Sequence, residues 1–222
     1  MVDGSGLNFE LINRSAQTAG VRISYAPMPW KRCLAELQAN RVDGAFAASY
    51  KTDRLELGAF PGGAVPDANK RLHTDSYVLV RKKGSAVEWN GKTIQGLDGA
   101  VGVQLGYSVG DQLRAMQVPV DDGSGTVQEL LLKLLAGRVA AAAIGGGDAK
   151  NVLNADRKVA GQLELLPIPL VEKHYFLMLS HALLESRPAL ASALWKGIET
   201  ARKSQVYQRS EANAFKANAK VP

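Results

Sequence analysis

Segments with the pattern of strands and segments with the pattern of helices alternate along this chain, and the alternation begins twice. The first series contains the short apolar run 45–48, and the second begins after Lys82-Lys83-Gly84 with the apolar run 100–104. On each side of this boundary a strand, a glycine-containing turn, a helix and an apolar strand follow one another. Alternating strands and helices form parallel sheets with helices on both faces. The sequence therefore predicts an α/β protein with two similar lobes rather than one sheet.

The periodic patterns also predict the order of the elements. Thr126-Val-Gln-Glu129 has the spacing of a capping box, and Pro188 suits the first position of a helix. We expect helices at 7–19, at 30–39, through Leu113 and Met116, from Thr126 to a stop at Gly137, at 148–153, at 188–203 and around Tyr207 and Phe215. We expect strands at 21–25, 45–48, 76–81, 100–104, 139–144, 163–168 and 175–179.

The composition argues against several classes of function. A chain of 222 residues with 46% hydrophobic content has material for one large domain or two small ones. The net charge of +6 comes without a long basic block, which argues against a nucleic-acid partner and favours small anionic ligands. Cys33 is the only cysteine, so no disulfide forms within the chain. The histidines His73, His174 and His181 lack metal-ligand spacing, and we expect no metal and no cofactor.

The run 43–54 has features of a site that holds an anion. Its apolar first half predicts a buried strand, which ends in the hydroxyl of Ser49 and leads to Arg54. Arginine presents a planar fork of donors that matches a carboxylate, and ligands of open α/β sheets bind at the carboxyl ends of strands. The alternative is a surface arginine paired with Asp53 or Glu56, and this run alone slightly favours the alternative.

Several runs together resemble a known family. They are Leu34-Ala-Glu-Leu-Gln-Ala-Asn-Arg-Val-Asp43 with the close Thr52-Asp53-Arg54, Leu97-Asp-Gly-Ala-Val-Gly-Val-Gln-Leu-Gly106, and Leu135-Ala-Gly-Arg-Val139. Their order and spacing, together with the C-terminal helices, resemble the extracellular solute-binding proteins of family 3, the polar-amino-acid receptors of ABC importers. The resemblance covers nearly the whole chain.

This resemblance implies the two-lobed α/β fold of type II periplasmic binding proteins. Two strands that cross between the lobes act as the hinge, and here they are expected near Tyr77–Arg81 and Leu170–Tyr175. The first lobe is then discontinuous, with residues 1–79 and 171–222, and the second lobe is formed by residues 80–170.

The resemblance also implies four ligand contacts in the first lobe. Arg54 falls on the arginine that clamps the ligand α-carboxylate, and Ser49 falls on a hydroxyl residue that bonds the ligand. Ala47 falls on a position whose backbone carbonyl receives the ammonium, and Trp30 on an aromatic residue that packs against the ligand side chain. Taken singly, a core position for Trp30 and a strand-end cap for Ser49 are the simpler interpretations. Because these residues together match the order and spacing of the family's site, the interpretation as a binding site is favoured.

In the second lobe, the resemblance places Tyr107 and Ser108 on a loop at a helix N-terminus, where backbone N–H groups meet the carboxylate. A surface aromatic is the alternative for Tyr107. Gln104 falls on a position that contacts the ligand side chain in some members. Gly145 stands where the family usually has an acid that pairs with the ammonium. Asp148 could reach in if the three glycines re-route the loop, but a helix N-cap is its favoured role. Because an unpaired buried charge is costly, the ligand is expected to be a carboxylate without an α-amine, or the site to be degenerate.

The start of the chain is a second departure from the family. Members carry an initial strand and an aromatic loop before the position at which this chain begins. The first lobe is then expected to lack a central strand and part of its site, unless another segment fills the gap. Because unpaired sheet edges pair with other chains, a dimer or a strand swap is a possible outcome of this departure.

The resemblance therefore predicts the substrate-binding component of an ABC importer, which binds an amino acid or related organic acid between two lobes and is read by a membrane permease. A sensing domain of a signalling system is the alternative. A cyclohexadienyl or arogenate dehydratase is disfavoured because Gly145 offers no general acid, so no catalytic residues are predicted. The chain shows no membrane span and no secretory signal. It is expected to be periplasmic with its signal peptide removed, or else cytoplasmic.

Overall fold

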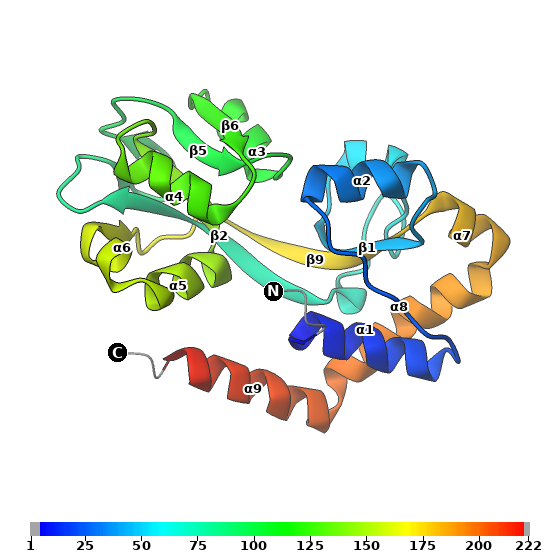
Figure 1. Ribbon diagram of the computed structural model, residues 1–222. Coiled ribbons are helices and arrows are strands. Elements are labelled where there is room, and N and C mark those ends of the chain that lie inside the picture. Colours follow the sequence, from blue (N-terminus) through cyan, green and yellow to red (C-terminus); the bar gives the residue numbers. More distant parts are fainter. Residues whose placement is uncertain (1–4, 220–222) are drawn as a thin grey trace. The chain divides into compact units, whose positions relative to one another are not determined.

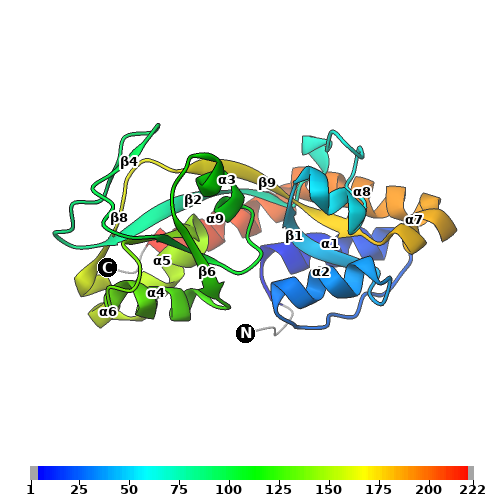
Figure 2. The ribbon, with the colours of Figure 1, turned by 90° about the horizontal axis from the view of Figure 1, so that it is seen from above.

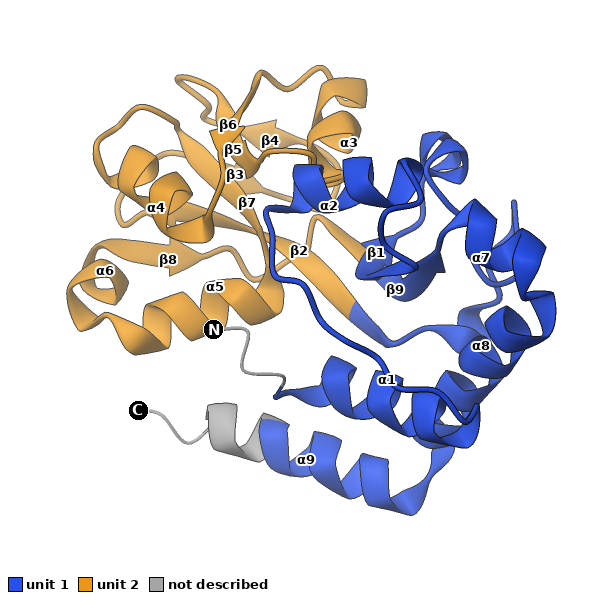
Figure 3. Cartoon of the chain, turned by 45° about the vertical axis from the view of Figure 1, so that its right-hand side comes forward, with its two compact units in different colours: residues 1–74, 173–221 blue, residues 75–172, 222 orange. Residues whose placement is uncertain are grey.

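The computed structural model describes the backbone of residues 5–219 and the side chains of residues 5–214 (Figure 1). The chain forms two compact units (Figure 3). Unit 1 contains the chain up to Thr74 and again from Lys173, and unit 2 contains Asp75–Glu172. The chain passes from one unit to the other within two strands, β2 (His73–Lys82) and β9 (Val171–Leu179).

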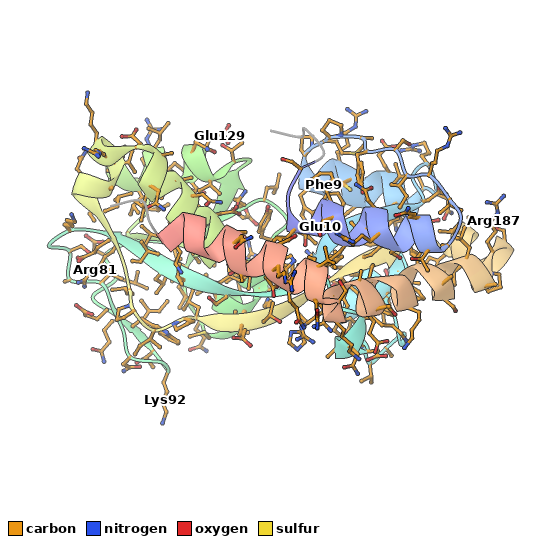
Figure 4. The ribbon with its side chains drawn as sticks, turned by 90° about the horizontal axis from the view of Figure 1, so that it is seen from below. Phe9, Glu10, Arg81, Lys92, Glu129 and Arg187 are labelled. Carbon is orange, nitrogen blue, oxygen red and sulfur yellow. The ribbon has the colours of Figure 1, made fainter. Side chains whose placement is uncertain are left out.

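Unit 1 is built on an antiparallel strand pair covered by helices. β1 (Gly44–Ser49) pairs with β9, with Ala45 opposite Met178 and Ala48 opposite Phe176. Three of the helices, α1, α8 and α9, lie side by side (Figures 1 and 4). The helices of the unit are α1 (Leu7–Thr18), α2 (Trp30–Gln38), α7 (His181–Ser186), α8 (Pro188–Lys203) and α9 (Gln205–Ala219), with 3₁₀ turns at Thr52–Glu56 and Ala68–Lys70.

Close packing of α1 against α8 forms the main core of unit 1. Leu11, Ile12 and Ile198 are almost completely buried in it, and burial of such side chains stabilises a fold by about 1.5–3 kcal/mol each. The approach of the two helices depends on Gly197, because a Cβ there would lie 2.5 Å from Ser15 Oγ. The Ser15 hydroxyl in turn donates a hydrogen bond to the backbone carbonyl of α8 rather than remaining unpaired.

Unit 2 contains a mixed sheet. β5 (Val101–Gln104) runs parallel to both β7 (Ala141–Gly145) and β6 (Val120–Ser124), and β2 runs antiparallel to β7. β8 (Leu163–Leu165) pairs with β2, while β3 (Glu88–Trp89) and β4 (Ile94–Gln95) form a separate hairpin. The helices are α3 (Val109–Ala115), α4 (Val127–Leu135), α5 (Gly146–Ala155) and α6 (Arg157–Gln162), of which α4, α5 and α6 lie together on one side (Figure 2).

Most of the predicted elements are confirmed. The capping box is present: Glu129 N–H donates to Thr126 Oγ1 at 3.1 Å, and Thr126 N–H donates to Glu129 Oε2 at 3.3 Å. Pro188 occupies the first turn of α8 as predicted. The predicted strand at 163–168 is shorter, ending at Leu165. The β3–β4 hairpin, β6, α6 and α7 were not predicted from the sequence.

The prediction of a strand at 21–25 is wrong. Its alternation is real, since Val21, Ile23 and Tyr25 are half-buried against the core of unit 1 while Arg22 and Ser24 are exposed. A strand also needs a neighbour for its backbone hydrogen bonds, and among residues 5–219 no strand pairs with this segment. The segment therefore remains irregular even though its side chains face the core as those of a strand would.

Candidate functional site

Arg54 is a buried arginine in unit 1, in the 3₁₀ turn that follows β1. Only 4% of its surface is exposed. Its Nη1 donates to the backbone carbonyl of Ser49 at 2.7 Å and to Ser49 Oγ at 3.0 Å. The interpretation of Arg54 as a surface arginine is therefore wrong, and the neighbouring Asp53 pairs with Lys51 instead, at 2.8 Å.

The indole ring of Trp30 lies beside this guanidinium. Trp30 is the first residue of α2, and the Arg54 Cζ atom lies 5.4 Å from the centre of its ring. This geometry is that of a cation–π contact. Three of the four residues predicted in the first lobe, Trp30, Ser49 and Arg54, are thus in contact, and together they fix the orientation of a buried cation.

Ala47 holds a strained backbone in β1. Its φ is +58°, a left-handed conformation that costs a residue with a Cβ on the order of 1–2 kcal/mol. The strain coincides with an irregularity in the pairing of β1 with β9, where one extra residue stands between Ala45 and Ala48. Such a bulge leaves the extra residue outside the regular ladder. Strained backbone of this kind is often found at binding sites.

In unit 2, three of the predicted residues lie at the connection from β5 to α3. Gln104 ends β5, and its backbone carbonyl accepts a hydrogen bond from Tyr107 N–H at 3.1 Å. Gly106 turns the chain with a φ of +79°, and the buried Ser108 is the N-cap residue of α3. Tyr107 is half-buried. The sequence thus brings Gln104, Tyr107 and Ser108 into one turn at the carboxyl end of a parallel strand.

Gly145 ends β7, and two carboxylates stand close to it. A Cβ on Gly145 would lie 3.4 Å from Asp75 Oδ2 and 3.7 Å from Asp148 Oδ2. The predicted role of Asp148 as an N-cap is wrong, because Gly145 is the N-cap residue of α5 and Asp148 is the third residue of that helix. Gly147 N–H donates to Asp75 Oδ2 at 3.4 Å. Two acids from other positions therefore approach the place from which a side chain at position 145 would extend.

The Asp75 carboxylate influences the titration of Asp148. Desolvation by the surrounding protein raises the pKa of the Asp148 carboxyl although the residue is exposed, and the nearby Asp75 carboxylate raises it further. A cation placed beside the pair would relieve this repulsion. Sequence reasoning missed Asp75, because only the pairing of β2 with β7, with Tyr77 opposite Gly145, brings it close to the end of β7.

The described residues contain no group of three or more histidine, cysteine or acidic side chains that could hold a metal ion. In the same part of the chain, none of the helices is both long enough and apolar enough to cross a bilayer. The arrangement thus offers a fixed guanidinium in unit 1, and in unit 2 a polar turn and a pair of carboxylates.

Comparison with protein families gives a match over most of the chain. The profile of the bacterial extracellular solute-binding proteins, family 3, matches residues 3–217. A comparison with curated proteins gives no match.

Several solved structures share this fold. The arginine-, lysine-, histidine-binding protein ArtJ from Geobacillus stearothermophilus is 17% identical, with a TM-score of 0.76 over 100% of this chain and 90% of that one. The amino acid ABC transporter substrate-binding protein AbpA from Streptococcus pneumoniae, bound to L-arginine, is 20% identical, with a TM-score of 0.73 over 98% of this chain and 88% of that one. A histidine kinase sensor domain with similarity to periplasmic binding proteins is 15% identical, with a TM-score of 0.75 over 94% of this chain and 85% of that one.

Proposed function

Because the chain belongs to the bacterial extracellular solute-binding proteins of family 3, we propose that it is the substrate-binding component of an ABC importer. The expected family and the type II periplasmic binding protein fold are both confirmed. The family and its structural neighbours bind amino acids and are binding proteins rather than enzymes. The proposed ligand is an amino acid or a closely related small carboxylate.

The buried guanidinium of Arg54 carries this proposal. A guanidinium taken out of water needs an anionic partner or good hydrogen bonds to offset its lost hydration. Ser49 and Trp30 fix its orientation, and a fixed fork of donors is what bidentate binding of a carboxylate requires. The proposed role of Arg54 is therefore to clamp the ligand carboxylate.

We assign the ligand ammonium to Asp75 and Asp148. They approach the point where the side chain of an acid at position 145 would begin, and a carboxylate pair attracts a cation more strongly than one carboxylate does. The strained Ala47 carbonyl is the proposed further acceptor. With this assignment, a ligand that carries an α-amine is favoured over one that lacks it. The proposed ligand contacts within unit 1 are Trp30, Ala47, Ser49 and Arg54, and those within unit 2 are Asp75, Gln104, Tyr107, Ser108, Gly145 and Asp148.

The proposal is tested by isothermal titration calorimetry of the purified protein with a panel of amino acids and with the organic acids that lack the α-amine. We expect binding of at least one amino acid, and weaker binding of its deaminated analogue. If no member of the panel binds, the receptor function is wrong for this chain. If only deaminated acids bind, the assignment of Asp75 and Asp148 to the ammonium is wrong.

A sensing domain is the second candidate function. The similarity to a histidine kinase sensor domain, with a TM-score of 0.75, supports it. Genes for a permease and an ATPase beside the gene of this protein would support transport, whereas genes for a kinase or a cyclase would support sensing. In both cases the proposed location is outside the cytoplasm, in the periplasm for the transport function.

We also propose that the protein is not a dehydratase, because its family and structural neighbours are binding proteins rather than enzymes. Conversion of prephenate or arogenate by the purified protein would contradict this.

Pairing with a second copy of the chain is a further part of the proposal, supported by the unpaired segment 21–25. If two copies pair through this segment, light scattering will give the mass of a dimer. Ile23→Pro removes a backbone hydrogen-bond donor from the segment and should reduce the fraction of dimer. A monomer at all concentrations would contradict it.

A further inference from the structure

Two arginines of unit 1 meet at one short turn. Arg71 Nη1 donates a hydrogen bond to the backbone carbonyl of Ala68 at 2.7 Å. Arg202 Nη2 donates to the backbone carbonyl of Asn69 at 2.8 Å. These carbonyls belong to consecutive residues of the 3₁₀ turn at Ala68–Lys70, whereas Arg202 lies in the last turn of α8. Packing of α8 against this turn therefore brings together two guanidinium groups from distant parts of the chain.

Neither of these guanidinium groups has a carboxylate beside it to offset its charge. Among the residues whose side chains are described, no ion pair joins Arg71 or Arg202 to an acid. Glu199 and Glu211 attract Arg202 from a distance, and Glu199 is already paired with two lysines of α8, at 3.0 and 2.6 Å. Two like charges in this arrangement repel one another, and a bound anion would relieve the repulsion.

The two arginines also keep donors that the turn does not use. Arginine has five N–H donors, and within the described part of the chain each of these two arginines gives hydrogen bonds from a single nitrogen. Arg202 Nε is buried and has no partner among the same residues. Burial lowers the pKa of Arg202, and the positive charge of Arg71 lowers it further. Buried polar groups are paired in most proteins, so an unpaired cationic donor calls for an explanation.

We propose that Arg71 and Arg202 form a binding site on unit 1 for a phosphate-type oxyanion. Two guanidinium groups present planar forks of donors that match the oxygen atoms of a phosphate. A doubly charged ligand is favoured over a singly charged one because it offsets both positive charges. The carbonyls of the 3₁₀ turn already hold each guanidinium, so less ordering is needed when the anion binds. This site lies outside the set of residues proposed to bind the amino acid.

Calorimetry with inorganic phosphate at low ionic strength is the first test, with sodium chloride of equal ionic strength as the salt control. The wild-type protein should bind phosphate. Arg71→Gln loses the charge but can still donate to the Ala68 carbonyl, and it should weaken phosphate binding by about tenfold or more. Arg209→Gln is the matched control, because Arg209 is an exposed arginine of the same unit and its loss changes the net charge equally. It should bind phosphate like the wild-type protein.

Vesicles distinguish free phosphate from the phosphate of a lipid headgroup, which shares its chemistry. The wild-type protein is sedimented with vesicles of phosphatidylglycerol and, for comparison, with vesicles of phosphatidylcholine, which have no net charge. If the site takes a headgroup, the protein should sediment with phosphatidylglycerol alone, and Arg71→Gln should reduce this more than Arg209→Gln does. Binding of phosphate in solution without this sedimentation would assign the site to a free oxyanion.

Several results would overturn the inference. It is wrong if the wild-type protein binds neither phosphate nor phosphatidylglycerol vesicles, or if Arg71→Gln and Arg209→Gln have equal effects, because binding then follows the overall charge. It is also wrong if Arg54→Ala abolishes phosphate binding and Arg71→Gln does not, because the anion then occupies the proposed amino-acid site.

Two further measurements keep the test decisive. If circular dichroism shows that Arg71→Gln is unfolded, Arg71→Lys takes its place. This variant keeps the charge but loses the planar fork, and it should weaken phosphate binding several-fold; an unchanged affinity would contradict the inference. Folded Arg71→Gln protein should bind amino acids like the wild-type protein, so failure of the receptor function and failure of the oxyanion site are separate results.

Discussion

The guanidinium of Arg54 lies against the indole ring of Trp30, with 5.4 Å between Cζ and the ring centre. The two residues come from different elements, the turn after β1 and the first position of α2. Their contact, with the two hydrogen bonds to Ser49, holds a charged group in one orientation inside unit 1. Preorganisation of this kind strengthens binding because less ordering is needed when the ligand arrives.

Replacement of Arg54 should therefore weaken ligand binding more than it weakens the fold. Hydrogen bonds to charged groups contribute about 1.5–3 kcal/mol each, so Arg54→Ala should lower the affinity by about 100-fold or more. Arg54→Lys keeps the charge but loses the planar fork, and should lower the affinity by about tenfold. Calorimetry with whichever amino acid binds best gives both values.

Arg138→Ala serves as the control for Arg54, because Arg138 is an exposed arginine. It should bind the ligand like the wild-type protein. Circular dichroism and melting temperature will show whether each Arg54 variant is folded. A folded Arg54→Ala protein with unchanged affinity would show that the carboxylate is bound elsewhere.

A second prediction concerns the packing of α1 against α8. In Gly197→Ala the new methyl group would lie 2.5 Å from Ser15 Oγ and 2.9 Å from Ser15 Cα, so the helices must separate. Overpacking of this kind costs about 1–3 kcal/mol, which outweighs the gain in helix propensity of up to about 1 kcal/mol. Urea denaturation should show a lower free energy of unfolding.

Gly161→Ala is the matched control for this change. Gly161 lies in α6, and apart from its chain neighbours and the backbone of its own helix, no described atom lies within 4 Å of the position its Cβ would take. The same substitution should therefore stabilise the protein by about 0.5–1 kcal/mol. Equal effects of the two substitutions would show that the contact of Gly197 with Ser15 does not limit the approach of the helices.

The helices could be predicted from the sequence where their signals are local. The capping box at Thr126 and the proline at Pro188 lie beside the turns that they start, so neither depends on the rest of the chain. β6 could not be predicted in this way. Its sequence, Val120-Asp-Asp-Gly-Ser124, has no apolar alternation, and it becomes a strand because it pairs with β5. The segment 21–25 shows the reverse case, with alternation but no pairing partner among the described residues.

The residues of the candidate site also fall into those that the sequence indicated and those that it did not. The resemblance to a family pointed to Trp30, Ser49 and Arg54 together, and the structure shows that they are in contact. Their role toward a ligand stays a prediction. Asp75 could not be found, because it is brought to its place by strand pairing that the sequence does not specify locally.

A third prediction uses the raised pKa of Asp148. A carboxyl whose pKa is higher in the folded protein holds its proton more firmly there than in the unfolded chain. From the ordinary aspartate value of about 3.9 up to the raised value, the folded state binds more protons, so the free energy of unfolding falls as the pH rises. Asp148→Asn removes this contribution. Its free energy of unfolding relative to wild type should therefore increase as the pH rises from about 3.9 through the raised pKa of Asp148.

Urea denaturation at several pH values measures this difference. Asp98→Asn, an exposed aspartate of the same unit, is the control and should differ from wild type by the same amount at every pH. If the difference for Asp148→Asn is also independent of pH, then Asp148 does not hold its proton more firmly in the folded protein.

The last prediction concerns the ligand ammonium. If Asp75 and Asp148 bind it, Asp75→Asn and Asp148→Asn should each lower the affinity for an amino acid by about tenfold, because each removes a charge-assisted hydrogen bond. Asparagine keeps the size of the side chain and can still accept the hydrogen bond that Asp75 receives from Gly147. The affinity for the analogue without the α-amine should stay the same or rise, since repulsion between the carboxylates is reduced. Calorimetry with whichever amino acid binds best and with its deaminated analogue separates a contact with the ammonium from a structural role. A structural role would lower both affinities equally, and Asp98→Asn should change neither.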